Sequence, residues 1–226
     1  MIAIVLQARL DSSRLPGKAL LSLDEKPLVL RVMEALNHIP ADSRILACPD
    51  DSLKAFTPLA VQAGFELHSG PKENVLERYC QTVRRFGIKR VIRATADNPF
   101  VFTDAATAIN AEAMALNADY SGYSGLPLGA GVESISAAAL LQAGTDAATP
   151  FDREHVCPWL YSHPELFRLH RPLAPLRWQG SDIRLTIDTH EDYERARELY
   201  AALKKLGDER YRGPAIISAY RALYGS

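Results

Sequence analysis

The sequence predicts an α/β fold in which helices cover both faces of a mostly parallel β-sheet. Apolar runs of strand length recur along the first half of the chain, helix-period segments separate them, and two of these segments close on a glycine. A strand followed by a helix, repeated several times, is typical of a parallel sheet, because each crossover helix packs its apolar side onto a face of the sheet.

Four strands are expected in the first half of the chain. Their sequences are IAIVL at residues 2–6, RILAC at 44–48, FELH at 65–68 and KRVIRAT at 89–95. The first predicted helix opens on Pro27, and the next two close on Gly64 and Gly87. Proline is well tolerated at the start of a helix, and glycine is the residue that most readily ends one.

The second half of the chain is less regular. We expect a helix at residues 103–117, short strands near 119–124 and 132–136, a helical stretch at 153–161, a strand at 183–188 and a long helix at 191–206. No internal repeat, low-complexity tract or linker interrupts the chain. Residues 1–226 are therefore expected to form a single domain.

Composition and charge narrow the functional classes. The 226 residues carry a formal net charge of −1, which gives no global attraction to nucleic acid or to an anionic membrane. The three cysteines have no disulfide or zinc spacing. The apolar start of the chain is too short for a secretion signal, and no apolar stretch approaches the ~20 residues of a membrane span. We expect a cytoplasmic protein with reduced thiols that binds neither nucleic acid nor membrane.

The loop after the first strand, QARLDSSRLPGK at residues 7–18 (the first loop), is typical of a phosphate site. Its long cations, serines and glycine are Arg9, Ser12, Ser13, Arg14, Gly17 and Lys18. Ligands of open α/β sheets bind beyond the carboxyl ends of the strands, and glycine lets the main chain approach them closely. Neither the G-x-x-x-x-G-K-[ST] pattern nor the G-x-G-x-x-G turn is present. A solvated basic loop is the alternative.

Asp97, in the segment RATADNPF, is the first candidate metal ligand. The strand at residues 89–95 should deliver it to the carboxyl edge of the sheet, where Pro99 forces Asn98 into an extended conformation. A carboxylate held there is well placed to bind a metal ion. The alternative is an Asp-Asn-Pro turn whose carboxylate only accepts bonds from nearby backbone N–H groups.

Asp188 is the second candidate. It ends the predicted strand at 183–188 on the face opposite Ile183, Leu185 and Ile187, by the period of two. Thr189 is expected to cap the following helix, with Asp192 three positions later as in a capping box. Asp188 is therefore not needed for capping.

Two carboxylates at carboxyl ends of strands predict a Mg²⁺ site. Without a cation the two groups would repel each other. Mg²⁺ is usually held by one or two carboxylates together with substrate phosphates and waters. Asp97, Asp188 and a triphosphate on the first loop would provide this set, so we expect Mg²⁺ as the cofactor.

Other polar residues are weaker indications. Glu133 lies within an apolar strand after a Gly-rich loop, and Arg153, Glu154 and His155 form a polar cluster. His155 is a candidate general base. Helix starts often carry such charges for capping or surface pairing, which is the alternative for this cluster.

Six segments occur in a fixed order: QARLDSSRLPGK, GPKENVLERY, RATADNPF, residues 129–133, REHVCPWLY and LTIDTHEDYE. In this order they resemble the cytidylyltransferases of the spore-coat polysaccharide type, within the acylneuraminate and 3-deoxy-manno-octulosonate cytidylyltransferase superfamily. The resemblance covers residues 2–200. It implies a single Rossmann-like, GT-A-type nucleotidyltransferase domain that binds CTP, uses Mg²⁺ and transfers CMP to a sugar or acidic sugar, releasing pyrophosphate, in polysaccharide or surface-glycan biosynthesis.

The resemblance also implies roles for individual residues. The triphosphate loop would comprise Ala8, Arg9, Ser12, Ser13, Arg14, Gly17 and Lys18. The segment near the nucleoside would comprise Ser69 and Gly70. Asp97 and Asp188 would bind the metal and, with Arg14 and Lys18, carry the catalysis. Acceptor binding or support of the site would involve Arg78, Asn98, Glu133, Arg153, Glu154 and His155.

The chain departs from the family pattern at five positions. Ala96 stands in place of a usual Gly, Cys157 in place of a Thr and His190 in place of a Pro, while Leu128 and Gly131 stand where acidic residues are common. The changes at Leu128 and Gly131 fall in the loop expected to bind the acceptor. They concern the identity of the sugar rather than the nucleotide.

Two other functions are alternatives to a cytidylyltransferase. A glycosyltransferase on the same fold usually holds its metal on a D-x-D pair, of which residues 96–98 supply one acid. A nucleotide-binding subunit without turnover is the non-enzymatic alternative. We expect a homodimer, the commonest soluble assembly.

Overall fold

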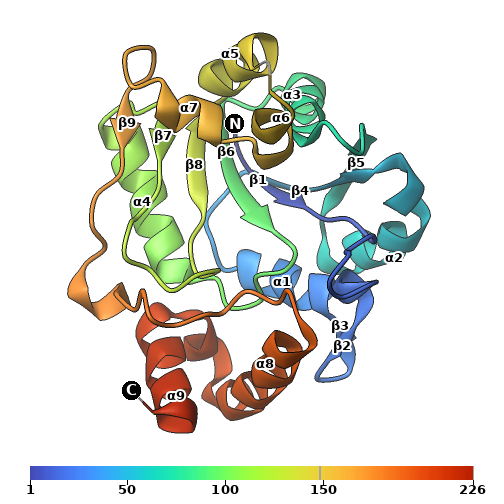
Figure 1. Cartoon of the computed structure of the whole chain (residues 1–226), viewed down its shortest axis with the longest axis vertical. Coiled ribbons are helices and arrows are strands. Elements are labelled where there is room, and N and C mark those ends of the chain that lie inside the picture. The colour runs from blue at the N-terminus through green and yellow to red at the C-terminus, as the bar shows by residue number, and fades with distance from the viewer. Residues whose placement is uncertain (148, 226) are drawn as a thin grey trace.

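A computed structural model describes residues 1–147 and 149–225 of the chain. At its centre is a seven-stranded sheet with the order β5-β4-β1-β6-β8-β7-β9 (Figure 1). The strands are β1 (Ile2–Gln7), β4 (Ser43–Pro49), β5 (Glu66–Gly70), β6 (Arg90–Thr95), β7 (Tyr120–Ser121), β8 (Glu133–Ser136) and β9 (Leu169–His170). β1, β4, β5 and β6 run parallel, and β8 runs antiparallel to β6 and β7. The predicted α/β fold with a mostly parallel sheet is confirmed.

Helices cover both faces of this sheet. They are α1 (Leu28–Leu36), α2 (Leu53–Ala63), α3 (Val75–Phe86), α4 (Thr103–Ala115), α5 (Ala137–Asp146), α6 (Pro150–His155), α7 (Pro158–Ser162), α8 (His190–Leu203) and α9 (Gly213–Tyr224). Apolar residues of α1, α2 and α4 pack on one face, and those of α3, α5 and α7 on the other. α8 and α9 form a third apolar cluster with residues around Phe100 and Trp178, at the bottom of Figure 1.

Short elements complete the chain. They are the hairpin β2 (Ser22–Leu23) and β3 (Lys26–Pro27) and the 3₁₀ helices η1 (Lys18–Leu20), η2 (Asp50–Ser52), η3 (Leu176–Trp178) and η4 (Lys204–Tyr211). η1 begins at Lys18, the last residue of the first loop, so it fixes the backbone from which that lysine side chain extends. The sequence did not predict this hairpin, α5 or α9.

The helix ends agree with the predicted signals. Pro27 precedes the first residue of α1, while Gly64 and Gly87 end α2 and α3 with φ angles of 74° and 64°. β1 is buried on both faces, since Ala3, Ile4, Val5 and Leu6 have no exposed surface. This explains why its sequence is continuously apolar rather than alternating.

The predicted strand at residues 183–188 is wrong in one respect. The segment is extended, but its backbone pairs with loops: Leu185 N–H donates to the carbonyl of Leu128 at 2.8 Å, and Ile187 N–H to that of Asp97 at 2.9 Å. One isolated bridge joins Leu128 to Arg184. The alternation of side chains is therefore that of a half-buried extended segment.

The predicted helical stretch at 153–161 is interrupted. α6 ends at His155, the φ of the following Val156 is +71°, and α7 begins at Pro158. Pro158 has no backbone N–H with which to continue the hydrogen bonds of α6, and the positive φ of Val156 breaks the helical path two residues before it. The break lets the two short helices run in different directions beside the sheet.

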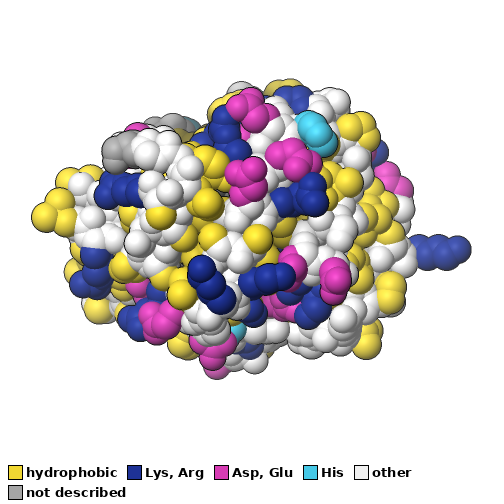
Figure 2. All heavy atoms as spheres, turned by 90° about the horizontal axis from the view of Figure 1, so that it is seen from below, with side chains coloured by type: hydrophobic (Ala, Val, Ile, Leu, Met, Phe, Trp, Pro, Cys, Tyr) yellow, Lys and Arg dark blue, Asp and Glu magenta, His cyan; other side chains and the backbone are white. Residues whose placement is uncertain are grey.

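The charges of α8 lie on a solvated surface. Arg195 pairs with Glu191, and Arg197 with Glu194 at 2.9 Å. Figure 2 shows the lower face of the molecule, on which basic and acidic side chains lie next to one another. In the described part of the chain, no helix has the length and apolarity needed to cross a membrane.

Gly129 has the most restricted environment of the glycines with positive φ. Its φ is +93°, and an added Cβ would lie 2.6 Å from the backbone nitrogen of Thr186 and 2.9 Å from Asn98 Oδ1. A Cβ at Gly87, with φ +64°, would meet no atom of the described residues within 4 Å. The close approach of Gly129 to the 183–188 segment leaves no space for a side chain.

Gly129→Ala should therefore destabilise the protein more than Gly87→Ala. Both changes impose about 1–2 kcal/mol of left-handed backbone strain, and Gly129→Ala adds about 1–3 kcal/mol of overpacking. The free energies of unfolding in urea measure the difference. Equal losses for the two variants would contradict the tight contact at Gly129.

Candidate functional site

A cavity of about 240 Å³ lies at the carboxyl ends of β1 and β6 (the first cavity). The first loop, α3, α6 and the two segments that carry Asp97 and Asp188 surround it. Its lining residues are Gln7, Ala8, Arg9, Ser12, Ser13, Arg14, Lys18, Ala19, Val75, Arg78, Arg93, Thr95, Ala96, Asp97, Glu154, His155 and Asp188. This is the edge of the sheet at which the sequence predicts a ligand site.

The first loop leaves β1 and turns back at Gly17. Gly17 has a φ of 68°, and its N–H donates to the carbonyl of Leu10 at 3.2 Å. Ser12 Oγ accepts from the N–H of Leu15 at 3.4 Å. Among the described residues, no acceptor bonds the backbone N–H groups of Ser13 and Arg14. The loop therefore offers both cationic side chains and available N–H donors to an anion.

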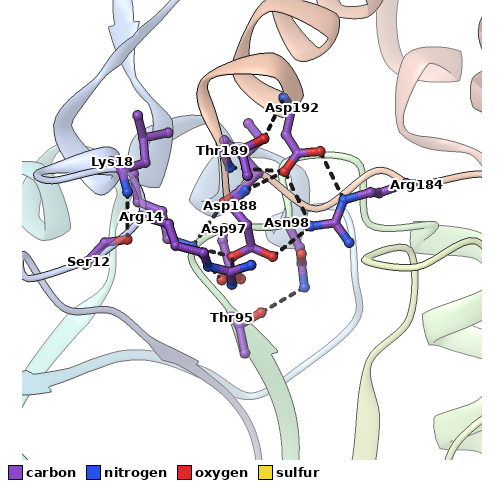
Figure 3. Close-up of polar contacts among 12 residues, drawn as sticks. Ser12, Arg14, Lys18, Thr95, Asp97, Asn98, Arg184, Asp188, Thr189 and Asp192 are labelled. Carbon is purple, nitrogen blue, oxygen red and sulfur yellow. Dashed lines mark hydrogen bonds and ion pairs between the residues drawn. The ribbon is translucent and has the colours of Figure 1, made fainter.

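Lys18 connects the two predicted metal ligands. Its Nζ donates to Asp97 Oδ2 at 2.9 Å, to Asp188 Oδ1 at 3.0 Å and to the carbonyl of Ile187 at 2.9 Å (Figure 3). The lysine side chain is 15% exposed, so these bonds are shielded from bulk water. The structure thus brings Asp97 and Asp188 together around one positive charge.

Asp188 is surrounded by cations. Besides Lys18, Arg14 Nη2 lies 3.1 Å from Oδ1 and Arg184 Nη2 donates to Oδ2 at 2.9 Å. Burial alone would raise the pKa of Asp188, but the bond from Lys18 and the charges of Lys18, Arg14 and Arg184 outweigh it and lower the pKa. Asp188 is consequently held as a carboxylate.

The start of α8 orients Asp188. Thr189 and Asp192 form the capping box expected from the sequence, and Asp192 Oδ2 also accepts from the N–H of Asp188 at 3.0 Å. Arg184 Nε donates to Asp192 at 2.9 Å. Burial acts to raise the pKa of Asp192, but the bonds from Arg184 and these N–H groups lower it to about 2. The carboxylate of Asp188 is thus left out of the helix cap.

The residues around Lys18 fit a divalent metal ion whose remaining ligands come from the substrate. Across residues 1–147 and 149–225, no group of three or more His, Cys, Asp or Glu side chains is arranged to hold a metal. Asp97 and Asp188 nevertheless both contact the same ammonium group, which marks a position for positive charge between them. Two carboxylates with phosphate oxygens and waters are the donors that Mg²⁺ usually takes.

The first cavity has an excess of positive charge. Arg9, Arg14, Lys18, Arg78 and Arg93 line it, against the carboxylates of Asp97, Glu154 and Asp188. Arg78 is 2% exposed; Nη1 donates to the carbonyl of Pro71 at 2.6 Å, and burial lowers the pKa of this arginine. Such a balance favours an anionic ligand such as a polyphosphate.

A second cavity, also of about 240 Å³, adjoins the first. It is lined by Arg93, Ala94, Thr95, Asn98, Tyr120, Gly122, Tyr123, Ser124, Gly131, Val132, Glu133 and Arg171. Arg93 and Thr95 line both cavities. Hydroxyl, amide and guanidinium groups predominate among its polar donors, which suits a hydroxylated molecule.

The structure distributes the predicted site residues unevenly. Ala8, Arg9, Ser12, Ser13, Arg14, Lys18, Arg78, Asp97, Glu154, His155 and Asp188 meet at the first cavity, while Asn98 and Glu133 line the second. Gly17 shapes the loop without lining the cavity. Ser69, Gly70 and Arg153 lie outside both linings. Gly70 packs on Arg78, whose Cγ would lie 3.3 Å from an added Cβ, and Arg153 Nε donates to the carbonyl of Ala147 at 3.4 Å.

Three polar residues in the lining of the first cavity were not singled out from the sequence. Gln7 and Thr95 end the strands β1 and β6, and Arg93 lies two residues before Thr95. The period of two places Arg93 and Thr95 on the same face of β6. This alternation was visible in KRVIRAT, but it does not tell which face of the strand borders a cavity.

The fold and this arrangement define a nucleotidyltransferase, and comparisons with known proteins identify its family. Residues 2–213 match the family model described as Cytidylyltransferase. The chain is 33% identical over 209 residues to the spore coat polysaccharide biosynthesis protein SpsF of Bacillus subtilis (strain 168), covering 88% of this chain and 86% of that protein. The chain therefore belongs to the cytidylyltransferase family and is an enzyme, as its resemblance implied.

Solved structures show the same fold. The structure of a cytidylyltransferase from Leptospira borgpetersenii serovar Hardjo-bovis has a TM-score of 0.87 at 20% identity, covering 98% of this chain and 93% of that one. That of CMP:2-keto-3-deoxy-manno-octonic acid synthetase complexed with CTP has a TM-score of 0.68 at 16% identity, covering 88% and 98%. At these identities the likeness concerns the fold alone.

Replacement of Lys18 by Met should raise the pKa of Asp188, because the ammonium group that stabilises the charged form is lost. In the wild type the pKa lies below 3.8, so this carboxylate stabilises the fold above pH 3.8 and the contribution is lost as the pH falls through the lower folded-state value. NMR titration of the side-chain carboxyl carbons measures the shift.

The matched control is Lys54→Met on α2, where the lysine is exposed. It should leave the Asp188 titration unchanged. An unaltered Asp188 pKa in Lys18→Met would show that Arg14 and Arg184 are sufficient to hold the carboxylate charged.

Proposed function

We propose that this enzyme is a CTP-dependent cytidylyltransferase that transfers CMP to a sugar or acidic sugar and releases pyrophosphate, in polysaccharide or surface-glycan biosynthesis. The observation that carries the proposal is Lys18, which reaches from the basic first loop to Asp97 and Asp188. The loop that binds the triphosphate in this proposal thus lies next to the two carboxylates that bind the metal. The proposal treats residues 1–226 as one nucleotidyltransferase domain.

The triphosphate binds to the first loop in this proposal. Arg9, Arg14 and Lys18 supply charge, and the N–H groups of Ser13 and Arg14 supply directed donors. Support comes from the excess of cations in the first cavity. The solved CMP:2-keto-3-deoxy-manno-octonic acid synthetase, which has the same fold, is complexed with CTP.

The reaction is an in-line displacement at the α-phosphorus. An acceptor oxygen forms a bond to phosphorus while the bond to the pyrophosphate oxygen breaks, and that electron pair leaves with pyrophosphate. The hydroxyl proton passes to His155 or to water. Arg9, Arg14 and Lys18 offset the charge that builds on the leaving group, as positioning and charge neutralisation dominate such transfers.

Asp97 and Asp188 hold Mg²⁺ in this proposal, and the ion, when bound, would neutralise phosphate charge and lower the pKa of the attacking hydroxyl. Lys18 already contacts both carboxylates at 2.9 and 3.0 Å. Its ammonium group therefore has to leave that position, and the oxygens of a triphosphate on the same loop offer it new partners.

The acceptor occupies the second cavity in this proposal. Tyr120, Tyr123 and Ser124 provide hydroxyl groups there, and Asn98 provides an amide. Arg171 adds an exposed guanidinium, which lies over the ring of Tyr161 at 4.8 Å. These groups suit a polyhydroxylated acceptor that carries a negative charge.

A cytoplasmic location and a homodimer complete the proposal. Cys48, Cys80 and Cys157 are buried free thiols, which is consistent with a reducing compartment. Size-exclusion chromatography with light scattering tests the dimer.

Calorimetric titration with CTP, UTP, GTP and ATP, each with and without Mg²⁺, tests the nucleotide assignment without knowledge of the acceptor. We expect selective binding of CTP that Mg²⁺ strengthens. Equal, metal-independent binding of all four nucleotides, or binding of none, would contradict the proposal. A pyrophosphate-release screen over sugars and sugar acids comes next, and chromatography of the products separates a CMP-sugar from the glycosidic product of a glycosyltransferase.

Asp97→Asn should lower turnover with CTP by about a hundredfold or more, the scale expected when one electrostatic stabiliser of a transition state is removed. The fold should persist, because the side chain is 28% exposed and the substitution conserves its shape. Pyrophosphate release with the acceptor found in the screen measures the effect. Asp182→Asn, at an exposed aspartate, is the control. Near-normal turnover in Asp97→Asn would exclude Asp97 from the mechanism.

A further inference from the structure

The two cavities meet at Arg93 and Thr95. The first cavity contains the basic loop, the second contains the hydroxyl groups of Tyr120 and Tyr123, and only these two residues line both among the described residues. In a two-substrate transfer the acceptor oxygen and the α-phosphorus must come into contact. The residues common to the two cavities are therefore those nearest to the point where the new bond forms.

Arg93 is held in one orientation at this point. It pairs with β8 in the sheet opposite Glu133, and its Nη1 donates to Glu133 Oε2 while Nη2 donates to Gln7 Oε1 at 3.0 Å. Its side chain is 15% exposed. Nε is buried and has no acceptor among the described residues, so the guanidinium group is not fully satisfied by the protein. The described residues accept one bond from each Nη, so the Nη groups keep further N–H donors for a ligand of the two cavities that Arg93 lines.

Both carboxylate oxygens of Glu133 accept hydrogen bonds from protein groups. Oε2 accepts from Arg93, and Oε1 accepts from the hydroxyl of Tyr120 at 2.7 Å. Burial would raise the pKa of Glu133, but the charge of Arg93 and the bond from Tyr120 keep it lowered. A carboxylate with both oxygens engaged in this way orients Arg93 rather than binding the acceptor itself. The resemblance implied either acceptor binding or support of the site, and orienting Arg93 is a form of support.

We propose that Arg93 contacts the α-phosphate of the bound nucleotide at the junction of the two cavities, and that Glu133 is the positioning residue that fixes it there. This proposal rests on the proposed function. The cations then bind different phosphates. Arg93 binds the phosphate that is transferred, whereas Arg14 and Lys18 bind the phosphates that leave.

The affinities of cytidine, CMP, CDP and CTP, measured by calorimetry in EDTA, separate these roles without any acceptor. Arg93→Met alone would leave Glu133 buried without its cation, so Arg93→Met is combined with Glu133→Gln, and thermal melting verifies folding. In the double variant we expect the gain in affinity from cytidine to CMP to fall by about tenfold to a hundredfold, the scale of a hydrogen bond to a charged group. The further gain from CMP to CTP should be unchanged.

Two comparison variants complete the test. Arg14→Met should show the reverse pattern, with a normal gain from cytidine to CMP and a reduced gain from CMP to CTP. Glu133→Gln alone should reduce the gain at CMP by less than the double variant does, because Arg93 keeps its charge and loses only its orientation.

The outcomes distinguish the two proposals. A normal gain at CMP in the folded double variant would overturn the role of Arg93 and leave the cytidylyltransferase function standing. An equal loss at every phosphate would also overturn it, because Arg93 would then act as a general source of charge. If the wild-type protein binds none of the four ligands, the proposed function fails and the role of Arg93 fails with it.

Discussion

The ammonium group of Lys18 between Asp97 and Asp188 is the interaction on which the site depends. It joins segments that lie 79 and 170 residues apart in the chain, at distances of 2.9 and 3.0 Å. Two carboxylates brought this close would repel each other without a cation, so the loop, the end of β6 and the start of α8 each need the others in place. The sheet provides this: β1 and β6 are parallel neighbours, so the first loop and Asp97 leave it at the same edge. The backbone bond from Ile187 to Asp97 then ties the third segment to the second.

Most of the fold could be predicted from the sequence, because its central strands are buried on both faces and its helices end at clear signals. The segment at residues 183–188 shows the limit of this reasoning. Its apolar residues Ile183, Leu185 and Ile187 are buried, which produces the alternation of a strand. Alternation reports which side chains are buried, whereas a strand is defined by the partners of its backbone. Here those partners are Leu128 and Asp97, in loops whose position depends on the rest of the fold.

Some residues of the site could also be predicted from the sequence, and others could not. Asp97 and the first loop could be predicted because each follows a strand, and the ends of parallel strands converge. Asp188 could be predicted only because it follows an apolar extended segment, which the sequence took for a strand. The place of Arg93 could not be derived with the same ease, since a basic residue within a strand is usually exposed at a sheet surface. Its partner Glu133 lies 40 residues away in the sequence, and the strand register that sets the two side by side exists only in the folded sheet. Ser69 and Gly70 show the opposite case. The resemblance implied that they lie near the nucleoside, but neither residue lines either cavity.

The cations of the first cavity differ in how firmly the protein holds them, and this difference has a chemical meaning. The Arg14 side chain is 63% exposed, and Lys18 is bonded to the two carboxylates that a divalent ion would also use. Both can therefore change partners when a metal-bound triphosphate arrives, which suits groups that accompany a leaving pyrophosphate. Arg93 is bonded to Glu133 and Gln7, neither of which is needed for metal binding in the proposed mechanism, and it is 15% exposed. A fixed charge needs no reorganisation as the transition state forms. Arg93, whose partners are not needed by the metal, is thus better suited than Arg14 or Lys18 to face the phosphorus at which bonds are exchanged.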